Sequence, residues 1–138
     1  MNLKLVKPII FFDLETTGLQ ISSDRIVEIS ILKIFPNGNK ESKTWLVNPT
    51  IPIPKETTKI HGISDEKIAN EPTFKQLAPE IEKIMHNCDL AGYNSNKFDI
   101  PLIAEEFLRA GINFDMNNRK SIDVQNIFHK LEKRTLTA

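Results

Sequence analysis

The sequence has one cysteine and no excess of charge. With Cys88 alone, the 138-residue chain forms no internal disulfide, and no Cys-x2-Cys or cysteine–histidine cluster indicates zinc. Cys88 stands at the start of an apolar run, which predicts a buried position. Lysine and arginine total 18, as do aspartate and glutamate, so the formal net charge is zero. Proteins that bind duplex nucleic acid through many phosphates are usually basic. Any contact with phosphates must therefore be local.

Long apolar runs are also lacking. No stretch approaches the ~20 apolar residues of a membrane span. The first apolar run, Ile9 to Phe12, is too short for the core of a signal peptide. There is no internal repeat and no low-complexity linker. With 40% hydrophobic and 26% charged residues, the composition is typical of a globular protein. We expect one domain over residues 1–138, in the cytoplasm and without membrane association.

The first third of the chain predicts strands. Apolar and β-branched runs indicate strands at Ile9 to Phe12, Arg25 to Phe35 and Ser42 to Val47. Asn37-Gly38-Asn39 predicts a tight turn, so the second and third strands are expected to be antiparallel neighbours. Residues 48–54 carry three prolines and predict a loop.

The rest of the chain alternates helix and strand. Ser64 predicts the cap of a short helix, and residues 74–84 show helical spacing, with Pro79 expected to kink or restart that helix. Beyond them, the pattern predicts a strand at Asp89 to Tyr93, a helix at Asp99 to Ala110, and an amphipathic helix through Val124, Ile127, Phe128 and Leu131. This order favours an α/β fold, with a mixed central sheet flanked by helices.

Two acids follow the first strand in Phe11-Phe12-Asp13-Leu14-Glu15-Thr16-Thr17-Gly18. Alternate side chains of a strand share a face, so Asp13 and Glu15 project to the same side. Carboxylates held at the end of a buried strand suit Mg²⁺ or Mn²⁺, and Gly18 lets the chain turn sharply there. Taken alone, however, the pair favours two ordinary surface acids.

A further acid lies in Gly92-Tyr93-Asn94-Ser95-Asn96-Lys97-Phe98-Asp99-Ile100-Pro101. Asp99 follows a predicted strand and a short loop, and it opens a predicted helix. An aspartate just before a proline in the first turn of a helix is a good N-cap. By itself, this segment therefore favours a capping role for Asp99.

Taken in order, Phe-Asp-Leu-Glu-Thr-Thr-Gly at residues 12–18 and Gly-Tyr-Asn with Phe-Asp at residues 92–99 resemble the first two motifs of the DnaQ-like (DEDDh) 3′→5′ exonucleases. That family includes the proofreading epsilon subunits of bacterial replicative DNA polymerases. The resemblance covers essentially the whole chain and implies a ribonuclease H-like fold. It also implies two-metal hydrolysis of phosphodiesters with Mg²⁺ or Mn²⁺, which releases mononucleotides. The implied substrate is a single-stranded or frayed 3′ end of DNA, with RNA left open, and a DNA polymerase is an implied partner.

The resemblance also assigns roles to residues. It makes Asp13, Glu15 and Asp99 the catalytic metal ligands, with carboxyl groups expected within about 4–8 Å of one another. The implied contacts to the terminal nucleotide are Thr16, Thr17, Gly18, Leu19, His61, Asn94 and Phe98. The catalytic histidine of the family belongs to a later His-x4-Asp motif. His61, in Ile60-His61-Gly62-Ile63, is therefore expected to be structural or to contact substrate, and not to be the general base.

The chain departs from the family after Asp99. The one later histidine, His129, is followed five residues on by Arg134 and not by an acid. The general base and fourth metal ligand of the family are thus absent from this sequence, and Thr135 predicts the start of another helix. We expect a domain truncated at its C-terminus, without its final helix and third motif, nearly inactive alone and prone to dimerise through exposed apolar surface.

Two alternatives to an exonuclease stay open. The first is a catalytically incomplete domain that only binds metal or nucleic-acid ends. The second is a plain α/β interaction module, which would require both motif matches to be accidental.

Overall fold

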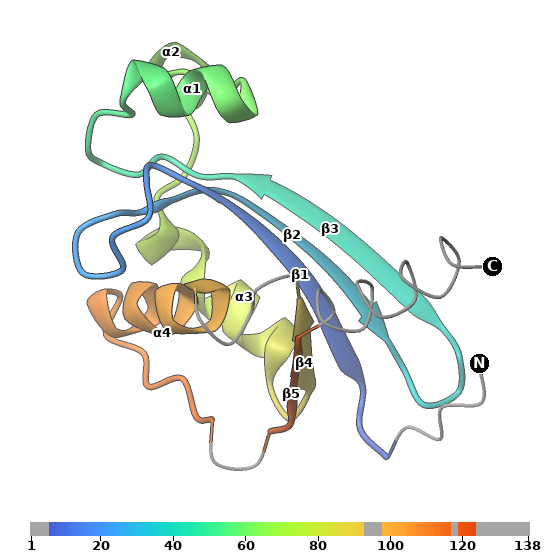
Figure 1. The fold of residues 1–138 in the computed structure, drawn as a ribbon. Helices are drawn as coiled ribbons and strands as arrows, with labels where there is room; N and C mark the ends of the chain where they lie inside the picture. The colour runs from blue at the N-terminus through green and yellow to red at the C-terminus, as the bar shows by residue number, and fades with distance from the viewer. Residues whose placement is uncertain (1–5, 93–97, 117–118, 124–138) are drawn as a thin grey trace, which may run out of the picture.

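A five-stranded sheet organises the molecule. The computed structural model describes residues 6–92, 98–116 and 119–123. The strands, in the spatial order β3-β2-β1-β4-β5 (Figure 1), are β1 (Ile9–Thr16), β2 (Ile26–Ile34), β3 (Lys40–Leu46), β4 (Asp89–Gly92) and β5 (Ser121–Asp123). β1, β2 and β3 pair antiparallel, whereas β4 pairs parallel with β1, and β5 parallel with β4. The expected mixed central sheet is confirmed.

Helices cover one face of this sheet. The described helices are α1 (Lys55–His61), α2 (Asp65–Ile68), α3 (Phe74–Met85) and α4 (Ile100–Arg109). Figure 1 shows α3 and α4 packed together on one face, while α1 and α2 lie beyond the end of the sheet. Among the described residues, no helix has both the length and the apolar character that crossing a membrane requires.

Alternation along β1 separates its two faces. Ile10, Phe12 and Leu14 are buried in the main core, which α3 and α4 complete. The residues between them point to the opposite, outer face, where Asp13 is exposed and Glu15 is half-buried. Burial of the apolar side chains on the inner face therefore holds the strand while its outer side chains stay accessible.

Most of the predicted elements are confirmed, some with shifted ends. β1 continues four residues beyond the predicted run, to Thr16, because its acidic end still pairs with β2. α3 runs through Pro79 as one helix, so the expected restart there is wrong. Cys88 is buried just before β4, and burial raises the pKa of its thiol. The expectations for residues 124–138 lie outside the described part of the chain.

Two short elements were missed. α1 has no buried residue, so it shows no apolar periodicity, although Pro54 precedes it and Gly62 ends it at a φ of 76°. β5 has only three residues, too few for an alternating pattern. Both elements depend on their neighbours in space more than on local sequence.

Candidate active site at the end of the first strand

The pair of acids lies on the outer face of the sheet, as the strand alternation predicts. In the register of β1 and β2, Asp13 lies opposite Ser30, and Glu15 lies opposite Glu28. Burial raises the pKa of Glu15, the charge of Asp13 raises it further, nearby His61 lowers it, and Glu28 raises it again. Three acids therefore place negative charge on a small area, and a bound cation would relieve their repulsion.

A groove of about 430 Å³ opens beside Asp13 on the same face. It is lined by Phe11, Phe12, Asp13, Ser30, Ile31, Leu32, Ser42, Thr44 and Gly92. The groove joins the carboxyl end of β4 to the middle of β1 and β2. Its lining is mostly apolar, and Asp13 is the one acid among these residues.

The loop after β1 is built on internal hydrogen bonds. The Thr16 hydroxyl donates to the Gly18 carbonyl (2.7 Å), and the Thr17 hydroxyl donates to Asp24 Oδ1 (2.8 Å). The backbone N–H of Gln20 donates to Asp24 Oδ2 (2.8 Å). A Cβ atom on Gly18 would lie 2.5 Å from Asp24 Oδ2, so glycine is needed there for close approach. The Asp24 carboxylate is therefore the centre of this loop.

His61 fastens α1 to the same loop. The backbone N–H of Ile63 donates to His61 Nδ1 (3.0 Å), so in the neutral ring Nε2 carries the proton and donates to the Thr16 carbonyl (3.0 Å). The Thr57 hydroxyl donates to the Thr17 carbonyl (3.2 Å). Because both ring nitrogens are engaged, His61 has no free lone pair with which to act as a general base.

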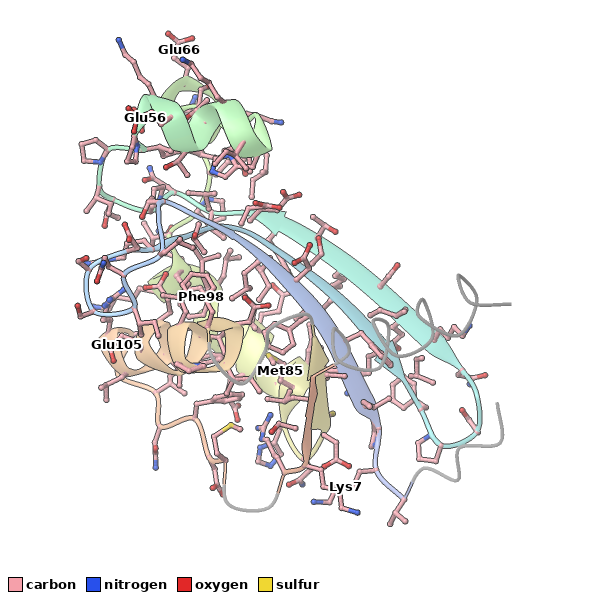
Figure 2. The ribbon with its side chains drawn as sticks, in the orientation of Figure 1. Lys7, Glu56, Glu66, Met85, Phe98 and Glu105 are labelled. Atoms are coloured by element: carbon pink, nitrogen blue, oxygen red, sulfur yellow. The ribbon has the colours of Figure 1, made fainter. Side chains whose placement is uncertain are left out.

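Asp99 does not cap α4. Its backbone is helical, and its side chain makes no capping hydrogen bond, so the N-cap interpretation is wrong. The residue is buried, with 6% of its surface exposed. Phe98 is half-buried and packs against the main core next to α4 (Figure 2). Asn94 lies outside the described residues.

The described residues bring together part of the expected site. The loop hydrogen bonds place His61 beside the Thr16–Leu19 segment and near Glu15. No group of three or more histidine, cysteine, aspartate or glutamate side chains in the described ranges could hold a metal ion. The expected convergence of Asp99 with Asp13 and Glu15 stays a prediction, with Asp99 buried at the start of α4 and Asp13 exposed on β1.

Sequence reasoning missed some residues of this region. Asp24 has no motif around it, and its role depends on a loop that folds back on Thr17. Ile60 is 85% exposed and Leu19 is 82% exposed, on the two segments that His61 joins. An isoleucine beside His61 in a segment without apolar periodicity was the available signal for Ile60.

Comparison with known proteins identifies the family to which this chain belongs. Residues 10–136 match the RNase_T family model, described as Exonuclease, and the chain belongs to this exonuclease family. The fold is similar to that of exonuclease I from E. coli, solved in complex with a 5cy-dA13 oligonucleotide, with a TM-score of 0.78. That match covers 88% of this chain and 29% of the other at 17% identity, and it confirms the ribonuclease H-like fold.

Named relatives are DNA polymerase III components. The epsilon subunit of Treponema pallidum is 33% identical over 72% of this chain and 43% of that protein. The epsilon subunit of Buchnera aphidicola subsp. Schizaphis graminum is 32% identical over 94% of this chain and 60% of that protein. A PolC-type DNA polymerase III from Caldanaerobacter subterraneus is 31% identical over 75% of this chain and 7% of that protein. The chain spans less than two thirds of each of these relatives.

Proposed function

We propose that this protein is a metal-dependent exonuclease that removes mononucleotides from the 3′ ends of DNA. The observation that carries the proposal is the Asp13–Glu15 pair on the outer face of β1, in a chain that matches an exonuclease family over residues 10–136. The proposed substrate is a single-stranded or frayed 3′ end. The neutral net charge of the chain agrees with contact at an end, where few phosphates are engaged.

The donor set at this site suits Mg²⁺ or Mn²⁺. Carboxylate oxygens are the hard ligands that these ions prefer, and Asp13 is accessible to solvent. The pKa of Glu15 is raised by burial and by Asp13, so a dication that binds both groups would favour their ionised forms. Asp99, buried at the start of α4, is proposed as the third ligand. Two such ions would activate water and stabilise charge on the attacking and leaving oxygens.

The loop after β1 and α1 would hold the terminal nucleotide. The exposed side chains of Leu19 and Ile60 are large and apolar, and they belong to segments joined by the His61–Thr16 and Thr57–Thr17 hydrogen bonds. Such side chains can pack on the face of a base that has left its stack. We propose that Thr16, Thr17 and Gly18 line the same pocket through their backbone, with Asn94 and Phe98 closing it.

A labelled single strand tests the function. Full-length protein should shorten a 5′-labelled deoxyoligonucleotide from its 3′ end in Mg²⁺ or Mn²⁺, and chelation should stop it. Asp13→Ala should remove the activity without lowering the melting temperature, while Glu66→Ala, an exposed acid on α2, should leave it unchanged. Normal turnover by the Asp13→Ala variant would refute the assignment. The same assay on an oligoribonucleotide decides between DNA and RNA.

The names of the relatives suggest a DNA polymerase as partner, and we propose that the chain acts beside it in the cytoplasm. Three of them are named as DNA polymerase III or as its epsilon subunit. We propose that this chain also works beside a polymerase, in proofreading. Co-purification of the natural protein with a DNA polymerase would support this partner, and a free exonuclease without one would count against it.

A second proposal concerns residues 1–138 by themselves. After Asp99 the only histidine is His129, with Arg134 five residues on, so the sequence holds no His-x4-Asp motif. We propose that these residues alone bind metal and nucleic-acid ends but hydrolyse slowly, because a positioned general base contributes about 10²–10⁴-fold. A kcat for residues 1–138 of about 1–10³ s⁻¹, the ordinary range for enzymes, would overturn this. Sedimentation of the same samples tests the predicted dimerisation.

A further inference from the structure

The loop between β1 and β2, residues 17–25, has little apolar packing of its own. Leu19 is 82% exposed, and Gln20, Ser22 and Ser23 are also exposed. Such a loop needs polar contacts to hold one conformation, because the hydrophobic effect contributes little there. Its contacts with the rest of the molecule therefore determine where Thr17, Gly18 and Leu19 lie.

Arg109, at the last turn of α4, supplies those contacts. Its Nη1 donates to the Asp24 carbonyl (3.1 Å), and its Nη2 donates to the carbonyls of Ile21 (3.1 Å) and Ser22 (3.0 Å). One planar guanidinium thus binds three carbonyls of the loop. The fixed fork of arginine matches this arrangement, whereas a lysine ammonium is a single point with a different geometry.

Glu106 sets the orientation of that guanidinium. It is 4% exposed, and its Oε1 accepts from Arg109 Nη1 (2.8 Å). Its Oε2 accepts from the backbone N–H of Ile26 (3.1 Å), the first residue of β2. The Glu106 carboxylate therefore binds Arg109 and the end of the loop together. Removal of Arg109 would leave the buried Glu106 carboxylate without this counterion, whereas removal of Glu106 would leave Arg109 beside Glu105 at 4.0 Å.

Asp24 connects the Arg109 contact to the Thr17–Leu19 segment. Asp24, whose carbonyl binds Arg109, also receives the Thr17 hydroxyl and the Gln20 N–H on its carboxylate. At the other end of α4, about 15 Å along the helix axis, lies Asp99. The same helix therefore carries a proposed metal ligand at its start and the anchor of the Thr17–Leu19 segment at its end.

We propose that Arg109 and Glu106 are positioning residues for the terminal-nucleotide pocket. They hold the loop so that Leu19, Thr17 and Gly18 face the 3′ end while α4 stays fixed relative to β1. This inference rests on the proposed exonuclease function. Asp13 and Glu15 stand on the strand and not on the loop. A loosened loop should therefore weaken substrate binding more than it slows the chemical step.

Steady-state kinetics of the full-length protein on a single-stranded deoxyoligonucleotide with Mg²⁺ test the proposal. Arg109→Gln should raise KM by about tenfold, which corresponds to the binding free energy of roughly one charge-assisted hydrogen bond. The same substitution should change kcat by less than about threefold. Glu106→Gln should do the same. Arg109→Lys should restore little, because it keeps the charge but not the fork. The double variant should have the same KM as each single variant, because Arg109 and Glu106 act through the same set of contacts.

A matched control and a second readout separate positioning from general stability. Lys43→Gln removes a cation from an exposed pair with Glu80 (2.9 Å) and should leave KM unchanged. Hydrogen exchange of the peptide covering residues 17–25, without substrate, should be faster in Arg109→Gln than in the natural protein. A merely structural role would lower the melting temperature and the amount of folded enzyme but leave KM unchanged.

Two different results would refute the exonuclease assignment and the positioning role of Arg109. If Asp13→Asn retains activity, the exonuclease assignment fails whatever Arg109 does. If Asp13→Asn is inactive and Arg109→Gln keeps its KM, the positioning role is overturned, whether or not loop exchange changes. Faster loop exchange together with a raised KM and a preserved kcat is the result that the structure predicts.

Discussion

The two faces of β1 have different roles: the inner face stabilises the fold, and the outer face carries the candidate catalytic acids. On the inner face, Ile10, Phe12 and Leu14 are buried against α3 and α4. On the outer face, Asp13 lines a groove, and its charge repels that of Glu15. The inner residues stabilise the position that the outer ones occupy. A strand can therefore hold two acids at a defined place even though the acids themselves oppose folding.

Removing an outer charge should have the largest effect on activity. Glu15→Gln keeps the shape of the side chain but removes a proposed metal ligand, so kcat/KM should fall by about 10³-fold or more, equivalent to several kcal/mol of charge stabilisation. The urea midpoint should not fall, because ionised Glu15 is repelled by Asp13. Rates within about threefold of the natural protein would show that Glu15 is a surface acid and nothing more.

Truncating an inner side chain should give the opposite pattern. Leu14→Ala removes a side chain that is 7% exposed, and the expected loss of unfolding free energy is about 2–5 kcal/mol. Urea denaturation followed by circular dichroism measures the loss. Turnover per folded molecule should stay near that of the natural protein at low temperature. A variant that stays fully stable would show that the core does not hold this strand.

Gly18→Ala tests the loop that follows β1, where a change should affect both stability and substrate binding. The new Cβ would meet Asp24 Oδ2 at 2.5 Å, so Asp24 or the loop must move, at a cost of about 1–3 kcal/mol. We expect a raised KM together with this smaller loss of stability. The matched variant is Gly38→Ala in the β2–β3 turn, where φ is 89° but no atom lies within 4 Å, so it should lose stability without a change in KM.

The smallest expected effect is on the pH dependence of stability. The folded-state pKa of Glu15 is raised above its unfolded value, so its contribution favours folding below the unfolded pKa and is lost as pH rises through the folded pKa. Without metal, the Glu15→Gln variant should therefore become slightly more stable than the natural protein as pH rises above the ordinary pKa of a glutamate, and it should keep that advantage at higher pH. Mg²⁺ should reduce that advantage. Urea midpoints across this range, with and without Mg²⁺, measure it, and parallel curves would contradict the coupling.

Sequence patterns predicted the long elements but not the contacts between distant ones. The apolar spacing of residues 74–84 indicated α3, and the β-branched run after Arg25 indicated β2. α1 was missed because it buries nothing, and it is placed by His61 and Thr57 contacting the loop. The spacing of apolar residues predicts which side of a helix or strand is buried. It does not predict a hydrogen bond between segments that lie far apart in the sequence.

The candidate site shows the same division. That Asp13 and Glu15 share a face follows from the two-residue period of a strand, which is a local property. That Asp24 receives the Thr17 hydroxyl, and that Arg109 binds the Asp24 carbonyl from 85 residues away, depends on how α4 packs on the sheet. The sequence by itself determined the mixed α/β fold and the direction of the two acids. Only the tertiary structure decided that Asp99 is buried without capping its helix, because burial depends on every neighbour in space.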